Sequence, residues 1–159
     1  MSTEISFLLS SPLHPAVVHF PIALLLIAAG FDAACLVFRR YLWLDRTATA
    51  LLTLGGIALG AAYLTGGRAA EAATPITGVA QGVLADHADL ALLTLWATGA
   101  AVILRLFVTW LGRDDLEVNL GIFRLASLVV VFGAAAMVIL TAYHGGQLDY
   151  DHGIGVSLG

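Results

Sequence analysis

The sequence predicts an all-α integral membrane protein, a four-helix bundle that forms a single transmembrane domain over residues 1–159. The first observation is the apolar composition, since 60% of the residues are hydrophobic and the mean hydropathy is +0.94. The second is the low charge, because only 11% of the residues are charged, whereas soluble domains have about a quarter. The third is a set of four long apolar runs that can each cross a bilayer.

The four runs cover about residues 15–38, 47–64, 87–111 and 120–144. A transmembrane helix needs about 20 such residues, because each residue advances the helix by about 1.5 Å. In the second run, Gly55, Gly56 and Gly60 include a small-xxx-small pair, which allows a neighbouring helix to approach closely.

The segments between the runs differ in length, and two of them, residues 39–46 and 112–119, are short connections. Residues 65–86 are rich in Gly, Ala and Thr and contain Pro75. We therefore expect a loop in this segment, with room for one short surface helix before Gly82.

The arginines predict how the bundle is oriented. The chain has no lysine, and six of its seven arginines lie in or near the two short connections: Arg39, Arg40, Arg46, Arg105, Arg113 and Arg124. Only Arg68 lies at the other face. By the positive-inside rule, the arginine-rich face is cytoplasmic. Both termini, the loop of residues 65–86 and the tail of residues 145–159 are then periplasmic, in a multi-pass protein of the inner membrane of a bacterium.

The histidines all lie at the predicted periplasmic face. His14 and His19 begin the first run, His87 begins the third, His144 ends the fourth and His152 follows in the tail. An ionisable side chain in the apolar zone is costly and usually has a function, and neutral imidazole binds haem iron or a divalent metal. The alternative is that histidine, being amphipathic, simply favours the interface.

Helix geometry limits which histidines can share a ligand. His14 and His19 are five residues apart, hence about 140° apart around an ideal helix, so they do not bind the same ion. Two sites beside the first run, each completed by His87 or His144, would use the four histidines in pairs. Bis-imidazole ligation of haem needs one ring from each of two facing helices, which bundles provide. The sequence thus predicts one or two b-type haems.

The tail carries a weaker prediction. Gly145 and Gly146 are expected to turn the chain sharply after the fourth run, because glycine adopts positive φ at little cost. The tail would then fold back over the periplasmic face as a lid. His152 lies beyond the membrane and is interpreted first as a residue of this lid or of the surface.

Three charged residues lie at similar depth near the predicted cytoplasmic face. Asp32 lies in the first run, Arg105 in the third and Arg124 in the fourth. An ion pair of Asp32 with Arg105 or Arg124 would avoid an unpaired charge in lipid. Structural pairing is the favoured interpretation, and a role in binding protons or a quinone headgroup is the alternative.

Several function classes are not supported. The single cysteine, Cys35, excludes an internal disulfide, a thiolate metal cluster and covalent c-type haem. The sequence has no phosphate-binding loop, zinc-protease motif or nucleophile elbow. The net charge of −4 gives no indication of a nucleic-acid partner. A non-catalytic electron-transfer or accessory subunit is therefore expected rather than an enzyme.

Two motifs resemble those of a known family. The stretches LHPAVVHFPIAL (Leu13–Leu24) and HGGQLDYDHGIGV (His144–Val156), with the histidine of DHADLAL between them, are similar to the four-span bacterial membrane family called domain of unknown function 2231. The resemblance covers nearly the whole chain. It implies a redox setting, since some members carry cytochrome c or Rieske domains, and it favours haem over a transported metal. The chain departs from the family pattern at Ala88 and Asp149.

The leading hypothesis is a cytochrome b-like membrane subunit, in which His14, His19, His87 and His144 supply haem ligands. It would pass electrons between a quinol pool and a periplasmic redox partner. The second hypothesis is a sensor or transporter that binds copper, zinc or iron through the same histidines. The third is a structural subunit without a cofactor. Under every hypothesis the partners are the lipid bilayer and further membrane or periplasmic subunits.

Overall fold

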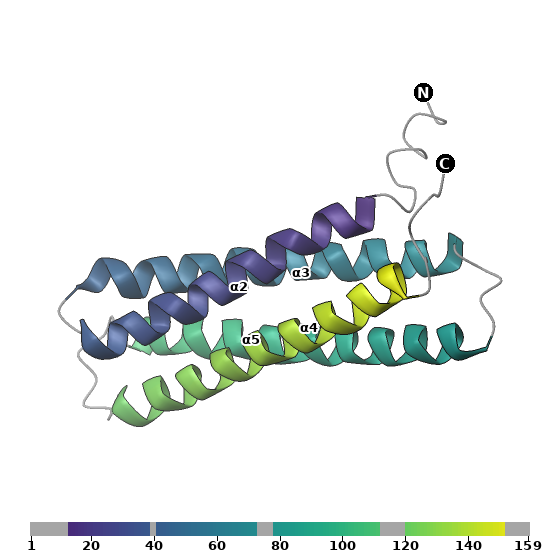
Figure 1. The fold of residues 1–159 in the computed structure, drawn as a ribbon. Coiled ribbons are helices and arrows are strands. Elements are labelled where there is room, and N and C mark those ends of the chain that lie inside the picture. The colour runs from purple at the N-terminus through teal and green to yellow at the C-terminus, as the bar shows by residue number, and fades with distance from the viewer. Residues whose placement is uncertain (1–12, 39–40, 73–77, 112–119, 152–159) are drawn as a thin grey trace.

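The computed structural model describes residues 13–38, 41–72, 78–111 and 120–151. These residues form the helices α2 (Leu13–Val37), α3 (Leu42–Ala72), α4 (Val79–Leu111) and α5 (Leu120–Tyr150). Each helix is long and apolar enough to cross a membrane. The predicted all-α four-helix bundle is therefore confirmed. Figure 1 shows the helices lying lengthwise, with α2 beside α3 and α4 beside α5.

The helices are longer than the sequence predicted, mainly at one end of the bundle, although α3 also begins at Leu42 rather than near residue 47. The expected loop of residues 65–86 is shorter, because α3 continues to Ala72 and α4 already begins at Val79. The expected sharp turn at Gly145 and Gly146 is absent, since α5 runs on to Tyr150. The glycines do not interrupt these helices, because glycine allows positive φ without requiring it. Among the described glycines, only Gly78 has a positive φ, of 72°.

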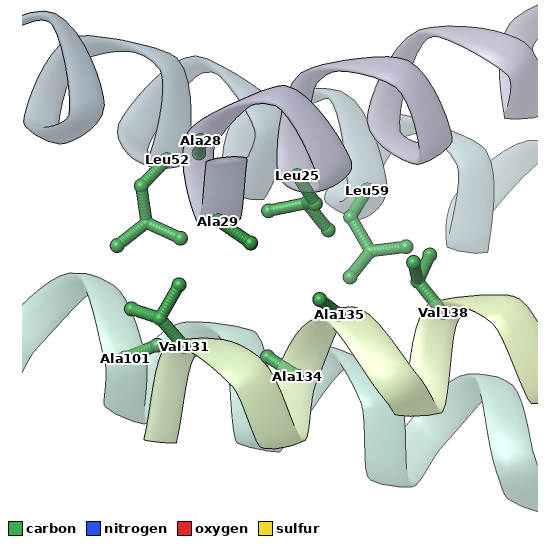
Figure 2. Close-up of a cluster of buried hydrophobic side chains, with 10 residues drawn as sticks. All are labelled: Leu25, Ala28, Ala29, Leu52, Leu59, Ala101, Val131, Ala134, Ala135 and Val138. Atoms are coloured by element: carbon green, nitrogen blue, oxygen red, sulfur yellow. The ribbon is translucent and has the colours of Figure 1, made fainter. Parts of the chain in front are cut away.

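The core lies where the two helix pairs face each other. Figure 2 shows side chains of α2 and α3 pointing toward those of α4 and α5. The core consists of Leu25, Ala28, Ala29, Leu52, Leu59, Ala101, Val131, Ala134, Ala135 and Val138. Half of these residues are alanine, and such small side chains let helix backbones pack closely in a membrane.

Glycines of α3 allow two close helix contacts. A Cβ at Gly55 would lie 2.8 Å from Leu25 Cδ2 of α2, and one at Gly56 would lie 3.2 Å from Val102 Cγ2 of α4. At Gly60 no heavy atom lies within 4 Å of such a Cβ. The adjacent pair Gly55 and Gly56, rather than the predicted spacing of Gly56 and Gly60, therefore makes the close approach.

The outer surface of the bundle is apolar on every helix. Large hydrophobic side chains are exposed on all four, among them Phe20, Ile57, Trp96, Ile103, Ile122 and Phe132. Such a surface is stable against lipid tails and costly in water.

Candidate functional site

The four histidines that the structure describes lie toward one end of the bundle, where α2 and α4 begin and α3 and α5 end. We call this the histidine end. His14 and His19 lie in the first two turns of α2, His87 lies about two turns into α4, and His144 lies about two turns before the end of α5. His152 and the predicted lid beyond Asp151 fall outside the described residues.

His14 is held by α3. Its Nδ1 lies 3.1 Å from Thr65 Oγ1, and the Thr65 hydroxyl donates its proton to the carbonyl of Ala62 at 2.9 Å. With the single hydroxyl proton directed to the Ala62 carbonyl, Thr65 accepts from His14, and Nδ1 carries the hydrogen. The ring lies against Gly66, where a Cβ would be 2.9 Å from His14 Cε1. The Nε2 atom of His14 consequently keeps its lone pair.

His87 is held by α5 in the same manner. Its Nδ1 lies 3.1 Å from the carbonyl oxygen of Thr141, which only accepts, so Nδ1 again carries the hydrogen. The ring lies against Gly145, where a Cβ would be 3.1 Å from His87 Cε1. Close by, the buried hydroxyls of Thr94 and Thr141 lie 2.7 Å apart and link α4 to α5. His87 Nε2 also keeps its lone pair.

His19 and His144 differ from these two, because each bonds to its own helix. His19 Nδ1 donates to the carbonyl of Pro15, and His144 Nδ1 donates to that of Leu140 at 3.0 Å. His19 is exposed and His144 is half-buried. The sequence predicted that all four histidines lie at one end of the bundle. Only His14 and His87 are turned so that the ring donates to a neighbouring helix.

The histidine end carries further charge. His87 lies within electrostatic reach of His14, His144 and Asp149, and His14 also lies within reach of Asp149. Asp149 is therefore within electrostatic reach of both His14 and His87. Among the described residues, no group of three or more His, Cys, Asp or Glu side chains is arranged to hold a metal ion.

Sequence reasoning missed Thr65, Thr141 and the glycine beside each ring. The available signal was the pair of Gly-Gly steps, Gly66–Gly67 and Gly145–Gly146. One glycine of each pair lies against an imidazole. These glycines were interpreted as turn or loop residues, so their role in packing against the imidazoles was not predicted.

A second polar cluster lies toward the opposite end of the bundle. Arg105 Nη2 lies 2.8 Å from Asp32 Oδ1 and 2.9 Å from Asp45 Oδ1, and Arg105 Nε donates to Thr49 Oγ1 at 3.1 Å. The ion pair of Asp32 with Arg105 is one of the two that were anticipated from depth. Arg124 is exposed, and within the described part of the chain it makes no ion pair with Asp32. Asp45 and Thr49 were not anticipated.

Comparison with known proteins places the chain in a family without assigning an activity. No curated protein and no solved structure matches it. The model of the family described as "Predicted membrane protein (DUF2231)" matches residues 10–158, a range that contains all four helices. The chain therefore belongs to the DUF2231 family of membrane proteins.

Proposed function

We propose that this protein is a membrane electron-transfer subunit in which His14 and His87 hold a b-type haem. The observation that carries the proposal is the matched environment of the two imidazoles. His14 of α2 donates its Nδ1 hydrogen to α3 and lies against Gly66. His87 of α4 donates its Nδ1 hydrogen to α5 and lies against Gly145.

This donor set fits the needs of haem ligation. An axial imidazole must be neutral and must offer an unprotonated nitrogen to the iron. A hydrogen bond from the other ring nitrogen fixes the tautomer and the ring orientation. Thr65 supplies that partner to His14, and the carbonyl of Thr141 supplies it to His87. When bound, haem would supply reversible one-electron chemistry.

The glycines support the same assignment. Gly66 and Gly145 let each ring lie directly on helix backbone, at a place that a methyl group would fill. His19 is exposed and His144 bonds to its own helix, so the proposal uses one haem rather than two. The arginine distribution supports a position for this haem near the periplasmic face of a bacterial inner membrane. A quinol pool and a periplasmic redox subunit are the proposed electron donor and acceptor.

Haem content of purified variants tests this assignment. The wild type, His14→Ala, His87→Ala and the matched control His19→Ala are expressed together, and bound haem is measured per protein chain. Removal of His14 or His87 is expected to abolish retention of haem, whereas His19→Ala retains it. Equal haem content in all four proteins would refute the assignment. Loss of bound haem from His19→Ala alone would also refute the assignment.

One observation favours a second function, a structural subunit without a cofactor. All four described histidines already have a hydrogen-bond partner at Nδ1, as expected of histidines that only join helices. In that case His14→Ala and His87→Ala lower the stability of the bundle, while the wild type contains neither haem nor metal by elemental analysis. A stoichiometric copper, zinc or iron signal without haem would instead indicate the non-haem site.

A further inference from the structure

The cluster around Arg105 contains two acids for one cation. One guanidinium nitrogen, Nη2, contacts Asp32 Oδ1 at 2.8 Å and Asp45 Oδ1 at 2.9 Å. The same nitrogen lies 3.4 Å from the Asp45 carbonyl oxygen, and Nε donates to Thr49. With both acids ionised, the cluster would carry a net charge of −1 inside a membrane helix bundle.

The hydrogen bonds favour one acid over the other. Asp45 Oδ1 accepts a hydrogen bond from Nη2. Asp32 Oδ1 lies equally near but has no hydrogen-bond partner among the described residues. The side chain of Asp32 is 2% exposed, against 41% for Asp45. A buried carboxylate oxygen that lacks a hydrogen bond makes the ionised form of the group costly.

Among the described residues, Arg105 is the only buried cationic side chain. Cys35 of α2 lies within electrostatic reach of Asp32, Asp45 and Arg105, and also of Arg124 of α5, which is exposed at the bundle surface. Ser127 of α5 is fully buried, and its hydroxyl has no partner among the described residues. The ring contact of Phe107 with Phe123 fixes the register of α4 and α5. It puts Ser127 at about the level of Arg105.

We propose that Asp32 is an exchangeable proton-binding site, open to water at the end of the bundle where α3 begins. A hydronium ion transfers its proton to a carboxylate oxygen of Asp32. An O–H bond forms there as one in hydronium breaks, water is released and no electrons move. The partly exposed Asp45, which shares Nη2 with Asp32, connects the site to water. While Asp32 is neutral, the positive charge of Arg105 and the negative charge of Asp45 cancel. Ser127 provides a polar group at about the same level of the bundle.

This inference is independent of haem, because the cluster and the histidine end use different residues. Infrared difference spectroscopy of the full chain in lipid nanodiscs tests it, by comparing spectra between about pH 4 and pH 9, a range that spans ordinary carboxyl titration. Aspartate labelled with ¹³C at its side-chain carboxyl identifies aspartate bands, and exchange into D₂O identifies protonated ones. Asp32→Asn is compared with Asp45→Asn, which removes the second acid of the cluster, and with Asp89→Asn as the matched control, since Asp89 is an exposed aspartate of α4 outside the cluster.

The expected result is a protonated-aspartate band that shifts in D₂O, disappears in Asp32→Asn and persists in Asp89→Asn. Absence of such a band from the wild type would overturn the proposal, as would a band that disappears only in Asp45→Asn. If Asp32→Asn does not fold, Asp32→Glu is used in its place. The protonated-carboxyl band should then lose its sensitivity to the aspartate label, and a band that keeps this sensitivity contradicts the proposal.

Discussion

Replacing Gly66 by alanine should disturb the His14 site, whereas the same change at its neighbour Gly67 should not. An alanine Cβ at position 66 would lie 2.9 Å from His14 Cε1, but at position 67 it would meet no heavy atom within 4 Å. Carbon atoms in ordinary contact are about 3.5–4.0 Å apart. The imidazole must therefore move by roughly 0.6 Å or more, which is larger than the tolerance of about 0.5 Å typical of functional sites.

The two variants are also expected to differ in stability. Overpacking of this kind costs about 1–3 kcal/mol, and replacing glycine by alanine within a helix returns about 0.5–1 kcal/mol. Gly67→Ala gains the second term alone. The free energy of unfolding should thus be about 1–3 kcal/mol lower for Gly66→Ala than for Gly67→Ala.

Unfolding in mixed detergent micelles, followed by far-ultraviolet circular dichroism, measures this difference. A second readout is haem affinity, which should fall about 10–100-fold in Gly66→Ala, as when a group that orients a metal ligand is disturbed. The reasoning is refuted if the two variants match in both stability and haem affinity. A difference in stability alone would leave the packing argument intact and contradict the ligand assignment of His14.

Two further pairs of variants test the packing by the same unfolding assay. Arg105→Ala should lower the free energy of unfolding by about 1.5–3 kcal/mol, because it removes charge-assisted hydrogen bonds between α3 and α4. Arg124 is exposed, so Arg124→Ala should change the free energy of unfolding by less than about 0.5 kcal/mol. Equal effects of the two substitutions would contradict the ion-pair assignment. Gly55→Ala should destabilise by overpacking against Leu25, and Gly60→Ala should be neutral or stabilising by up to about 1 kcal/mol. The reverse order would mean that α2 and α3 do not pack as described.

The four spans could be predicted from the sequence because hydropathy and length determine whether a segment crosses a bilayer. Helix ends at the histidine end could not, because Gly66 and Gly145 occur equally in turns and at close helix contacts. Glycine permits a turn without requiring one. The glycine pairs therefore marked positions of structural importance correctly, but they suggested turns where the chain is helical.

For the candidate sites, the sequence predicted how far along the bundle each side chain lies, but not which way it points. Spacing along the chain put His14, His19, His87 and His144 at one end, but whether a ring faces the bundle depends on helix rotation and on the neighbouring helix. His19 lies within α2 and is nevertheless exposed. The partner Thr65 is fifty-one positions from His14 in sequence, and such a contact follows only from the packing of α2 on α3.

The most direct test of the central proposal is a reduced-minus-oxidised absorption spectrum of the wild-type protein, purified in mild detergent and treated with dithionite. Haem held between His14 and His87 predicts a Soret band that shifts on reduction and a sharp α-band in the reduced state. Well-expressed, folded protein that shows neither feature, even after incubation with added haem, would contradict the proposal.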